Sequence, residues 1–434
     1  MKFLVKIHLF FLFLFLDAFA GMFYDIIPVL KNFDVYKRIL CEFGLIFIAI
    51  ISFRKESKIY LYLFFVVIFV AVVSTLNNKG IDIFHFINGT RDFVPMFFSI
   101  IFIVNMLHSS KKEFFIRKMN SFIALFLLVS VPVSVLQFLA FGGGDAVGGT
   151  VGWGGSGNLS MLIYLCTFCI LMQNFNKNRI LQSLYKNKWL FLLWIPSFIN
   201  ETKVTILLIL LFFVLLLKMN LKNILFSIFA SLLSFIGFIN LYPYIYNQKL
   251  PKYIFIYENE VDLEYSINKL EDSKIWDIEN LAGLGDSRTL RLLMGYILME
   301  NEIDWLIGKG LGHFKGSQTS QTDLAKENEY LVMGSRSFIL LITLQVGIIG
   351  TLFVYWAIFK SCLCMQNLRI RLFLVAVVLG MAYYIVSFVS FYFCAIFFYA
   401  ALSPRFSCKK DFIKQFDFLK IFSLPEKTRS PAFA

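Results

Sequence analysis

Long apolar runs recur through this chain, and they constrain its fold more than any other feature. A helix needs about 20 predominantly apolar residues to cross the hydrocarbon core of a bilayer. About twelve runs approach that length, with charged residues strung between them. They lie near 3–23, 39–53, 59–76, 93–108, 119–141, 158–173, 188–200, 204–217, 223–242, 337–359, 370–387 and 389–404. The sequence therefore predicts an all-α polytopic membrane protein.

Composition excludes an ordinary soluble enzyme. Hydrophobic residues make up 59% of the chain and charged residues 16%, whereas soluble domains are nearer one half and one quarter. The net charge of +13 does not indicate nucleic-acid binding. The basic residues lie between apolar runs, where they set membrane topology, and they do not gather on one soluble domain.

Basic residues orient the predicted spans, because short inner loops of membrane proteins are enriched in lysine and arginine. With the N-terminus inside, the short outer loops contain few of them: Lys31, Lys37, Arg38, Lys79, Arg91 and Lys203. The short inner loops contain many more: Arg54, Lys55, Lys58, Lys111, Lys112, Arg117, Lys118, Lys177, Arg179, Lys186, Lys188, Lys218, Lys222, Lys360, Arg369 and Arg371. An alternative, one long helix over 188–217, would remove this bias and bury Glu201 and Lys203 in the bilayer. A hairpin is therefore favoured there.

This topology divides the chain into four parts. Residues 1–242 hold nine predicted helices with short loops, 243–336 form a large outer (periplasmic) helical loop, 337–404 hold three more helices, and 405–434 are a cytoplasmic tail. The first run resembles a signal peptide ending at 18–20, but an uncleaved first helix is preferred because further spans follow. We expect a bacterial inner (plasma) membrane protein with both termini in the cytoplasm. The predicted outer loops contain no cysteine, so no disulfide is expected there.

Polar residues gather in the predicted outer segments: 88–92, the glycine-rich 142–157, 200–203, 286–291 and 335–337. Asp286 precedes an amphipathic run, and Arg288 and Arg291 follow at a spacing that puts both on one helical face. Two guanidiniums beside a helix N-terminus suit a pyrophosphate. Two ordinary surface arginines are the alternative.

Further basic residues stand at the outer ends of predicted spans. Arg336, Lys203 and Arg91 occupy positions that the positive-inside bias disfavours, so they indicate an electropositive outer pocket. Snorkelling at a helix end is the alternative. The glycines of 308–312 lack a nucleotide-binding signature and predict a tight turn. His313, which follows them, is a possible base or a structural histidine.

The glycine-rich segment 142–157 contains no basic residue. Its Trp153 and the following Asn158 provide an aromatic face and an amide, which a sugar ring can use for stacking and hydrogen bonding. The alternative is a plain hairpin loop.

Several of these segments together resemble the O-antigen ligase and O-antigen polymerase superfamily. The resemblance lies in Ser335-Arg336-Ser337 with Gly347-Ile-Ile-Gly350, in Asp286-Ser-Arg288 followed by Gly308-Lys-Gly310-Leu-Gly312, in Asn200-Glu-Thr-Lys203, in the glycine-rich loop through Asn158, and in Asn88-Gly-Thr-Arg91-Asp92. It covers about 80–350, and the order and predicted side of these motifs make it specific. It implies an architecture similar to C-type glycosyltransferases. Arg336 and Ser337 stand where the ligases carry histidine and asparagine, which favours a polymerase.

The resemblance implies glycosyl transfer from an undecaprenyl-pyrophosphate-linked oligosaccharide to a second lipid-linked glycan, without cofactor or metal. The resulting hypothesis assigns Arg288, Arg291 and Arg336 to the pyrophosphate, with Lys203 and Arg91 in support. Trp153 and Asn158 are assigned to the sugar. Asp286, Glu201 and His313 are the candidate bases. A polysaccharide chain-length regulator is a possible partner.

Three alternatives remain open. An O-antigen ligase would transfer the finished glycan to lipid A-core. A flippase or other transporter should place charges within its spans around a central cavity; here Asp17 and Glu42 are the clearest charges within the spans, and no inverted pair of broken helices is evident. A structural component of a polysaccharide assembly complex is the third alternative.

Overall fold

The fold is taken from a computed structural model of the chain. It describes residues 3–78, 83–144, 146–152, 154–174, 187–200, 204–216, 298–299, 301–312, 337–384 and 388–403, with isolated positions at 185, 225, 227–229, 232–233, 236–237 and 295. Most of the predicted outer loop and the tail after 403 thus lie outside the described residues, and the predicted domain boundaries remain predictions.

The described part of the chain is helical and contains no strand. Its α-helices are α1 (Phe3–Ile26), α2 (Asp34–Ile51), α3 (Lys58–Asn77), α4 (Ile83–Thr90), α5 (Val94–Leu107), α6 (Lys112–Phe141), α7 (Ser156–Asn174), α9 (Ile195–Ile199), α10 (Val204–Leu216), α15 (Glu302–Ile307), α18 (Phe338–Leu363), α19 (Leu368–Tyr384) and α20 (Phe391–Leu402). Short 3-10 turns join several of them: η1 (Pro28–Phe33), η2 (Lys55–Ser57), η3 (Arg91–Phe93), η4 (Gly149–Val151) and η5 (Lys188–Trp194).

Among the described residues, five helical stretches are long and apolar enough to cross a membrane: Leu4–Tyr24, Lys55–Asn77, Ile83–Leu107, Lys112–Phe141 and Phe338–Leu363. Their outward faces carry large apolar side chains, such as Leu76 at 77% and Leu352 at 65% exposure. A soluble protein rarely exposes so much apolar surface. The chain is therefore an α-helical, multi-pass membrane protein, while the number of twelve spans remains a prediction.

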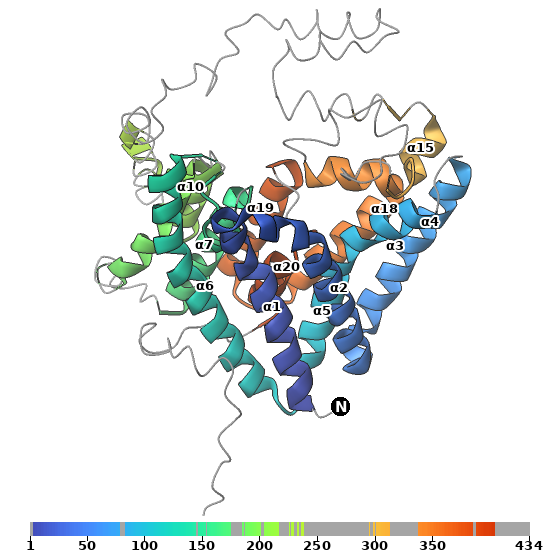
Figure 1. Cartoon of the computed structure of the whole chain (residues 1–434), viewed down its shortest axis with the longest axis horizontal. Helices are drawn as coiled ribbons and strands as arrows, with labels where there is room; N and C mark the ends of the chain where they lie inside the picture. The colour runs from blue at the N-terminus through green and yellow to red at the C-terminus, as the bar shows by residue number, and fades with distance from the viewer. Residues whose placement is uncertain are drawn as a thin grey trace, which may run out of the picture.

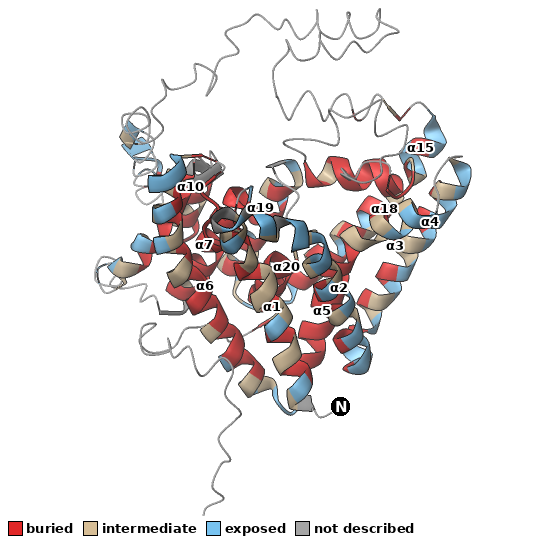
Figure 2. Cartoon of the chain, in the orientation of Figure 1, coloured by how far each residue is buried: buried red, intermediate tan, exposed pale blue. Residues whose placement is uncertain are grey.

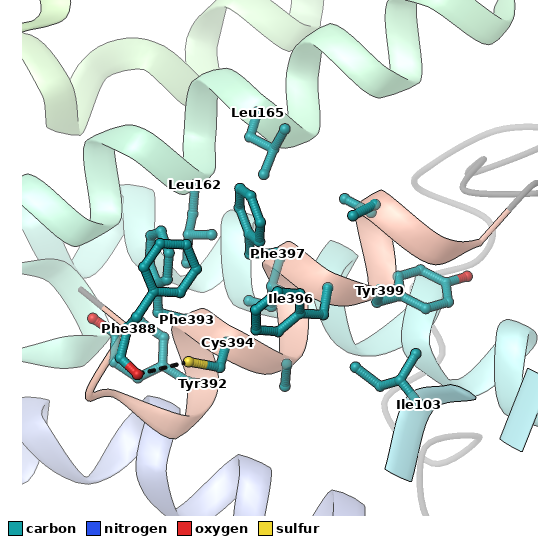
Figure 3. Close-up of a cluster of buried hydrophobic side chains, with 14 of the residues drawn as sticks. Ile103, Leu162, Leu165, Phe388, Tyr392, Phe393, Cys394, Ile396, Phe397 and Tyr399 are labelled. Carbon is teal, nitrogen blue, oxygen red and sulfur yellow. Dashed lines mark hydrogen bonds between the residues drawn. The ribbon is translucent and has the colours of Figure 1, made fainter. Parts of the chain in front are cut away.

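Helix α20 forms the centre of the bundle, surrounded by α1, α5, α6, α7 and α18 (Figure 1). Its residues from Phe391 to Ala401 are all buried, whereas exposed residues lie on the peripheral helices (Figure 2). At 12 residues it extends about 18 Å, less than the hydrocarbon thickness of about 30 Å. Its Phe393 and Phe397 pack beside Leu162 and Leu165 of α7 (Figure 3). The predicted span 389–404 is thus a short core helix.

The bundle has two chemically different ends. At one end, here called the polar end, α1, α3 and α6 finish and α5, α7, α18 and α20 begin. At the other, called the basic end, stand Arg54, Lys55 and Lys58 after α2. Most residues of the helices between the two ends are apolar, as expected of a membrane protein.

One predicted span is not a continuous helix, and the hairpin favoured over one long helix at 188–217 agrees with the structure. Helix α18 is broken at Gly347, whose backbone has φ 63° and ψ −169°, a combination that essentially only glycine adopts. The other case is 188–217, where the ring of Trp194 lies 5.0 Å from that of Phe212. One straight helix would hold these residues about 27 Å apart, so the chain folds back between them.

Candidate functional site: two polar clusters at one end of the bundle

The polar end contains the described part of the predicted site. Arg91 and Asn158 are the predicted site residues that the structure describes. The others lie outside the described residues: Glu201, Lys203, Trp153, Asp286, Arg288, Arg291, His313 and Arg336. The structure describes segments that neighbour several of these positions in the sequence.

The first group of contacts, here called the α18 cluster, joins segments 88–92, 308–312 and 344–347. It is built on the break in α18. A helix that stops at Gly347 leaves the carbonyls of Leu344 and Gln345 without their usual helical donors. Lys309 N–H donates to the Leu344 carbonyl at 2.8 Å, and Gly310 N–H donates to the Gln345 carbonyl at 3.2 Å. The loop backbone thus satisfies buried groups that a membrane interior could not.

Glycines allow this close approach. A Cβ built on Gly308 would lie 2.6 Å from the Gly347 nitrogen, and one on Gly347 would lie 2.4 Å from the Leu306 oxygen. Gly308, Gly310 and Gly312 all have positive φ, which confirms the tight glycine turn expected from the sequence. Any side chain at Gly308 or Gly347 would force the two backbones apart.

Helices α3 and α4 hold the same turn from the other side. The Ser74 hydroxyl donates to the Gly308 carbonyl at 2.6 Å, and the Asn78 amide donates to it at 3.2 Å. A Cβ on Gly89 would lie 2.5 Å from the Gly312 nitrogen. Gln345 Nε2 lies 3.4 Å from Asp92 Oδ2, so segment 88–92 contacts both other segments of the cluster.

Arg91 forms a bidentate salt bridge with Glu42 of α2. Its Nε and Nη2 contact the two carboxylate oxygens, Nη2 at 3.3 Å, and its Nη1 donates to Asn88 Oδ1 at 3.2 Å. Both side chains of the ion pair are mostly buried, at 21% and 14% exposure. The Arg91 charge is therefore balanced within the protein, and its first role is to connect α2 with the start of α5.

The second group of contacts, here called the glycine-loop cluster, contains the described residues of 146–160 together with Asn200. Residues 146–150 are buried. The Gln137 side chain donates to the Gly149 carbonyl at 3.0 Å and accepts from the Gly149 N–H at 2.7 Å. This paired amide fixes the loop to α6. The loop is thus a packed part of the fold, unlike a plain exposed hairpin.

The same loop packs closely on α1 and α9. A Cβ on Gly21 would lie 1.7 Å from the Val151 oxygen, so the two backbones are in direct contact. Asn200 Nδ2 donates to the Ser156 carbonyl at 3.1 Å and to Ser160 Oγ at 2.9 Å. Asn200 immediately precedes Glu201 and Lys203, so this contact holds the start of their segment against α7.

The N-terminus of α20 lies between the two clusters. The ring of Phe388 packs on that of Phe338 in α18, with 5.2 Å between the ring centres, and α20 also packs against α7, whose first residues belong to the glycine-loop cluster. The Tyr392 N–H donates to Asp17 Oδ2 at 2.9 Å. A carboxylate at a helix N-terminus satisfies free N–H groups and is favoured by the helix dipole.

Asp17 connects this helix start to a charged group on α2. Lys37 Nζ lies 3.6 Å from Asp17 and 2.9 Å from Asp34, and Arg38 Nε lies 2.7 Å from Asp34. Burial acts to raise the pKa of the Asp34 carboxyl, but Arg38 and Lys37 outweigh it and hold that pKa below its ordinary value. Burial acts to lower the pKa of Lys37, but Asp17 and Asp34 outweigh it and raise that pKa.

The cations described at the polar end that enter these clusters are paired. Lys37 pairs with Asp17 and Asp34, Arg38 with Asp34, Arg91 with Glu42, and Lys309 with Asp304 at 2.6 Å. The positive charges of these four side chains are therefore balanced by carboxylates within the described residues. Within the described part of the chain, no three His, Cys, Asp or Glu side chains are grouped as metal ligands would be.

Three residues that hold this end together were not identified from the sequence: Gln137, Asp304 and Gln345. The partners of Asp17 and Glu42 were not identified from it either. A usable signal existed in each case, because an amide or carboxylate within or beside an apolar run needs a partner. The identity of that partner depends on helix packing, which periodicity does not reveal.

Comparison with known proteins does not assign a family. No family model matches this chain, and no curated protein matches it.

Proposed function

We propose that this protein is a glycosyltransferase of the O-antigen polymerase type, joining oligosaccharide repeat units carried on undecaprenyl pyrophosphate. One observation supports it most. The described parts of the segments that resemble that superfamily lie in two clusters, and both clusters contact α20 or the helices packed on it. They are dispersed over some two hundred and fifty positions of the sequence. The predicted topology puts them all on one side of the membrane, but the direct contacts between 88–92, 308–312 and 344–347 were not implied by it.

In the proposed topology the polar end faces outward from a bacterial inner membrane, about twelve helices span it, and both termini are cytoplasmic. Segment 243–336 then covers the polar end. The basic residues at the opposite end agree with the usual enrichment of lysine and arginine in cytoplasmic loops.

The proposed reaction forms a glycosidic bond and breaks the bond between the donor's anomeric carbon and its pyrophosphate. An acceptor hydroxyl attacks that carbon and loses its proton to a base, for which Asp286, Glu201 and His313 are candidates. The lipid pyrophosphate leaves with its charge stabilised by Arg288, Arg291 and Arg336. Arg336 directly precedes Ser337, whose side chain caps α18 by accepting from the Leu340 N–H at 3.2 Å. The described structure thus fixes the start of α18, one residue after Arg336.

A transporter of the same lipid-linked oligosaccharide is the second candidate, because broken membrane helices also occur at transporter binding sites. The break in α18 is the observation that favours it. However, the carbonyls of Leu344 and Gln345 that the break leaves without helical donors accept from the N–H groups of Lys309 and Gly310. This pairing favours a structural role for the break.

The test is the surface polysaccharide of a deletion strain, separated on a gel. A polymerase predicts that the ladder collapses to single attached repeat units. Loss of all attached glycan, with long chains still on the lipid carrier, would instead identify a ligase. Accumulation of single units on carrier in the inner leaflet would identify a transporter.

Complementation then tests the assigned arginine. Arg288→Ala should reduce polymer formation about 10²–10³-fold, the usual effect of removing one group that stabilises transition-state charge. Arg117→Ala, an exposed arginine at the basic end, is the matched control and should restore the full ladder. Normal chain length in the Arg288→Ala strain, at equal protein level, would refute the assignment.

A further inference from the structure

A groove lies on the membrane-facing surface of the bundle, and its lining includes no residue of the two polar clusters. It is enclosed by α2, α3 and α5 near the basic end, has a volume of about 210 Å³, and is lined by Ala49, Ile50, Phe53, Leu61, Phe98 and Ile101. Phe98 and Ile101 are buried and form its floor, whereas Ile50 and Phe53 are 58% and 39% exposed and form its rim. Every lining side chain is apolar, so the groove suits a hydrocarbon chain and has no polar side chain to bind a polar ligand.

Cations stand where the groove reaches the basic end. Phe53 is followed directly by Arg54 and Lys55, and Lys58 begins α3. Arg54 Nη1 donates to the His108 carbonyl at 2.8 Å, which places the guanidinium between the ends of α2 and α5. Lys55 and Lys58 are exposed.

The charge of this turn is positive overall. The turn contains three cations and one carboxylate, the exposed Glu56. Lys58 Nζ lies 5.3 Å from the ring centre of Tyr62, which keeps the ammonium on the lipid-facing side of α3. An apolar groove that ends in fixed and exposed cations is complementary to one amphiphile: an apolar chain with an anionic head at the membrane surface.

We infer that this groove binds an acyl chain of an anionic glycerophospholipid, whose phosphate contacts Arg54, Lys55 and Lys58. The chain runs from the cations toward the floor at Phe98, and the lipid belongs to the leaflet that meets the basic end. The bound lipid fills the space between three helices and neutralises the turn that connects two of them. Its binding is independent of the glycan chemistry proposed for the polar end.

The test uses the full-length protein purified in mild detergent and titrated with phosphatidylglycerol or phosphatidylcholine of identical acyl chains, with bound lipid counted by native mass spectrometry. Wild-type protein should retain one phosphatidylglycerol in preference to phosphatidylcholine. Lys55→Gln/Lys58→Gln should weaken phosphatidylglycerol binding by at least about ten-fold, since each cation near a membrane surface contributes roughly five-fold. Ile50→Trp should weaken it by obstructing the groove from its exposed rim.

Two matched controls separate this site from general lipid contact. Lys188→Gln/Lys360→Gln removes the same charge elsewhere at the basic end, and Leu352→Trp adds the same indole at another lipid-facing position, 65% exposed. Both should bind phosphatidylglycerol as the wild type does. Equal binding of the two lipids, or a wild-type affinity in Ile50→Trp, would overturn the inference. Displacement of phosphatidylglycerol by an equimolar polyprenyl phosphate would also overturn it, by identifying a substrate lipid as the occupant.

Discussion

At the scale of single residues, the polar end depends on backbone contacts that allow no side chain. Gly347 illustrates this best, because it combines a positive φ with the contact to Leu306. The sequence motif Gly347-Ile-Ile-Gly350 is one of those that resemble the O-antigen ligase and polymerase superfamily. The structure explains why the first of these residues is glycine, because a side chain there would collide with the backbone of Leu306.

Gly347→Ala should therefore destabilise the protein by at least about 1–3 kcal/mol, the usual strain of a non-glycine residue in this region of φ and ψ. Thermal unfolding in detergent measures the loss, and the polysaccharide ladder should shorten with it. Gly380→Ala is the matched control, because its Cβ would meet nothing closer than Met161 at 4.0 Å. Equal unfolding temperatures for the two variants would show that the break is not needed.

Arg91 needs a test that separates its structural partner from its proposed substrate. Because both its Nε and Nη2 contact Glu42, we expect Arg91→Gln, Glu42→Gln and the double variant to show a coupling energy of about 0.5–3 kcal/mol in unfolding. If Arg91 also supports the pyrophosphate, Arg91→Gln should shorten the polysaccharide more than Glu42→Gln does. Additive unfolding effects would contradict the bidentate pairing.

The Asp34–Lys37 group predicts a pH dependence. The pKa of Asp34 is lowered in the folded protein, so its stabilising contribution is present above the unfolded value of about 3.9 and is lost as the pH falls through the folded value. The pKa of Lys37 is raised, so its contribution is present below about 10.4 and is lost as the pH rises through the folded value.

Asp34→Asn should accordingly lower stability at neutral pH by about 1–2 kcal/mol and flatten the decline between neutral and acidic pH. Unfolding temperatures measured from pH 7 down to pH 3 provide the comparison. Glu56→Gln, at an exposed carboxylate of the basic end, should follow the wild-type curve. A parallel shift of the Asp34→Asn curve, without a change of slope, would show that Asp34 does not titrate as argued.

At the scale of elements, the helices were predictable and their interruptions were not. Long apolar runs predicted α1, α3 and α7 within a few residues. The same rule predicted a continuous 337–359, because one glycine within an apolar run is tolerated by a helix as well as by a break. The choice between a continuous helix and a break depends on whether another segment can donate to the freed carbonyls. The backbone N–H groups of Lys309 and Gly310 donate to the carbonyls of Leu344 and Gln345, which lack helical donors. Because the two segments are far apart in the sequence, a rule based on local sequence cannot predict this pairing.

The burial of the glycine-rich loop was likewise not predictable from local sequence. Its composition is typical of an exposed connection, yet residues 146–150 are buried. Gln137, within the run 119–141, is what holds it. Ser130, seven positions earlier on α6, adds a contact to Thr150 at 3.2 Å.

Gln137→Leu should leave the Gly149 N–H buried and unpaired and remove one of the two donors to the Gly149 carbonyl, at a cost of about 1–3 kcal/mol for an unpaired buried group. Limited proteolysis of the loop should become faster and the unfolding temperature should fall. Ser121→Ala, on the same helix but at a hydroxyl that contacts only the exposed Arg117 carbonyl, is the control. Unchanged proteolysis in Gln137→Leu would mean that other contacts hold the loop.

At the scale of the whole molecule, composition and charge distribution predicted the class of protein, an α-helical multi-pass membrane protein. The central position of α20 was not predictable, because a fully apolar helix can face lipid or lie within a core. The orientation of the two ends follows from the distribution of basic residues, and it is the assumption on which the proposed glycan chemistry depends.

Cysteine labelling of intact cells tests that orientation directly. Of the described cysteines, Cys364 is exposed, and it follows α18 on the predicted inner side. In a Cys364→Ser background, Asn77→Cys at the polar end should react with a membrane-impermeant maleimide, because Asn77 is exposed at the end of α3. Glu56→Cys at the basic end should react only after permeabilisation. The reverse pattern would place the polar end in the cytoplasm, where a lipid-linked donor waiting outside could not reach it, and the proposed polymerase reaction would then be excluded.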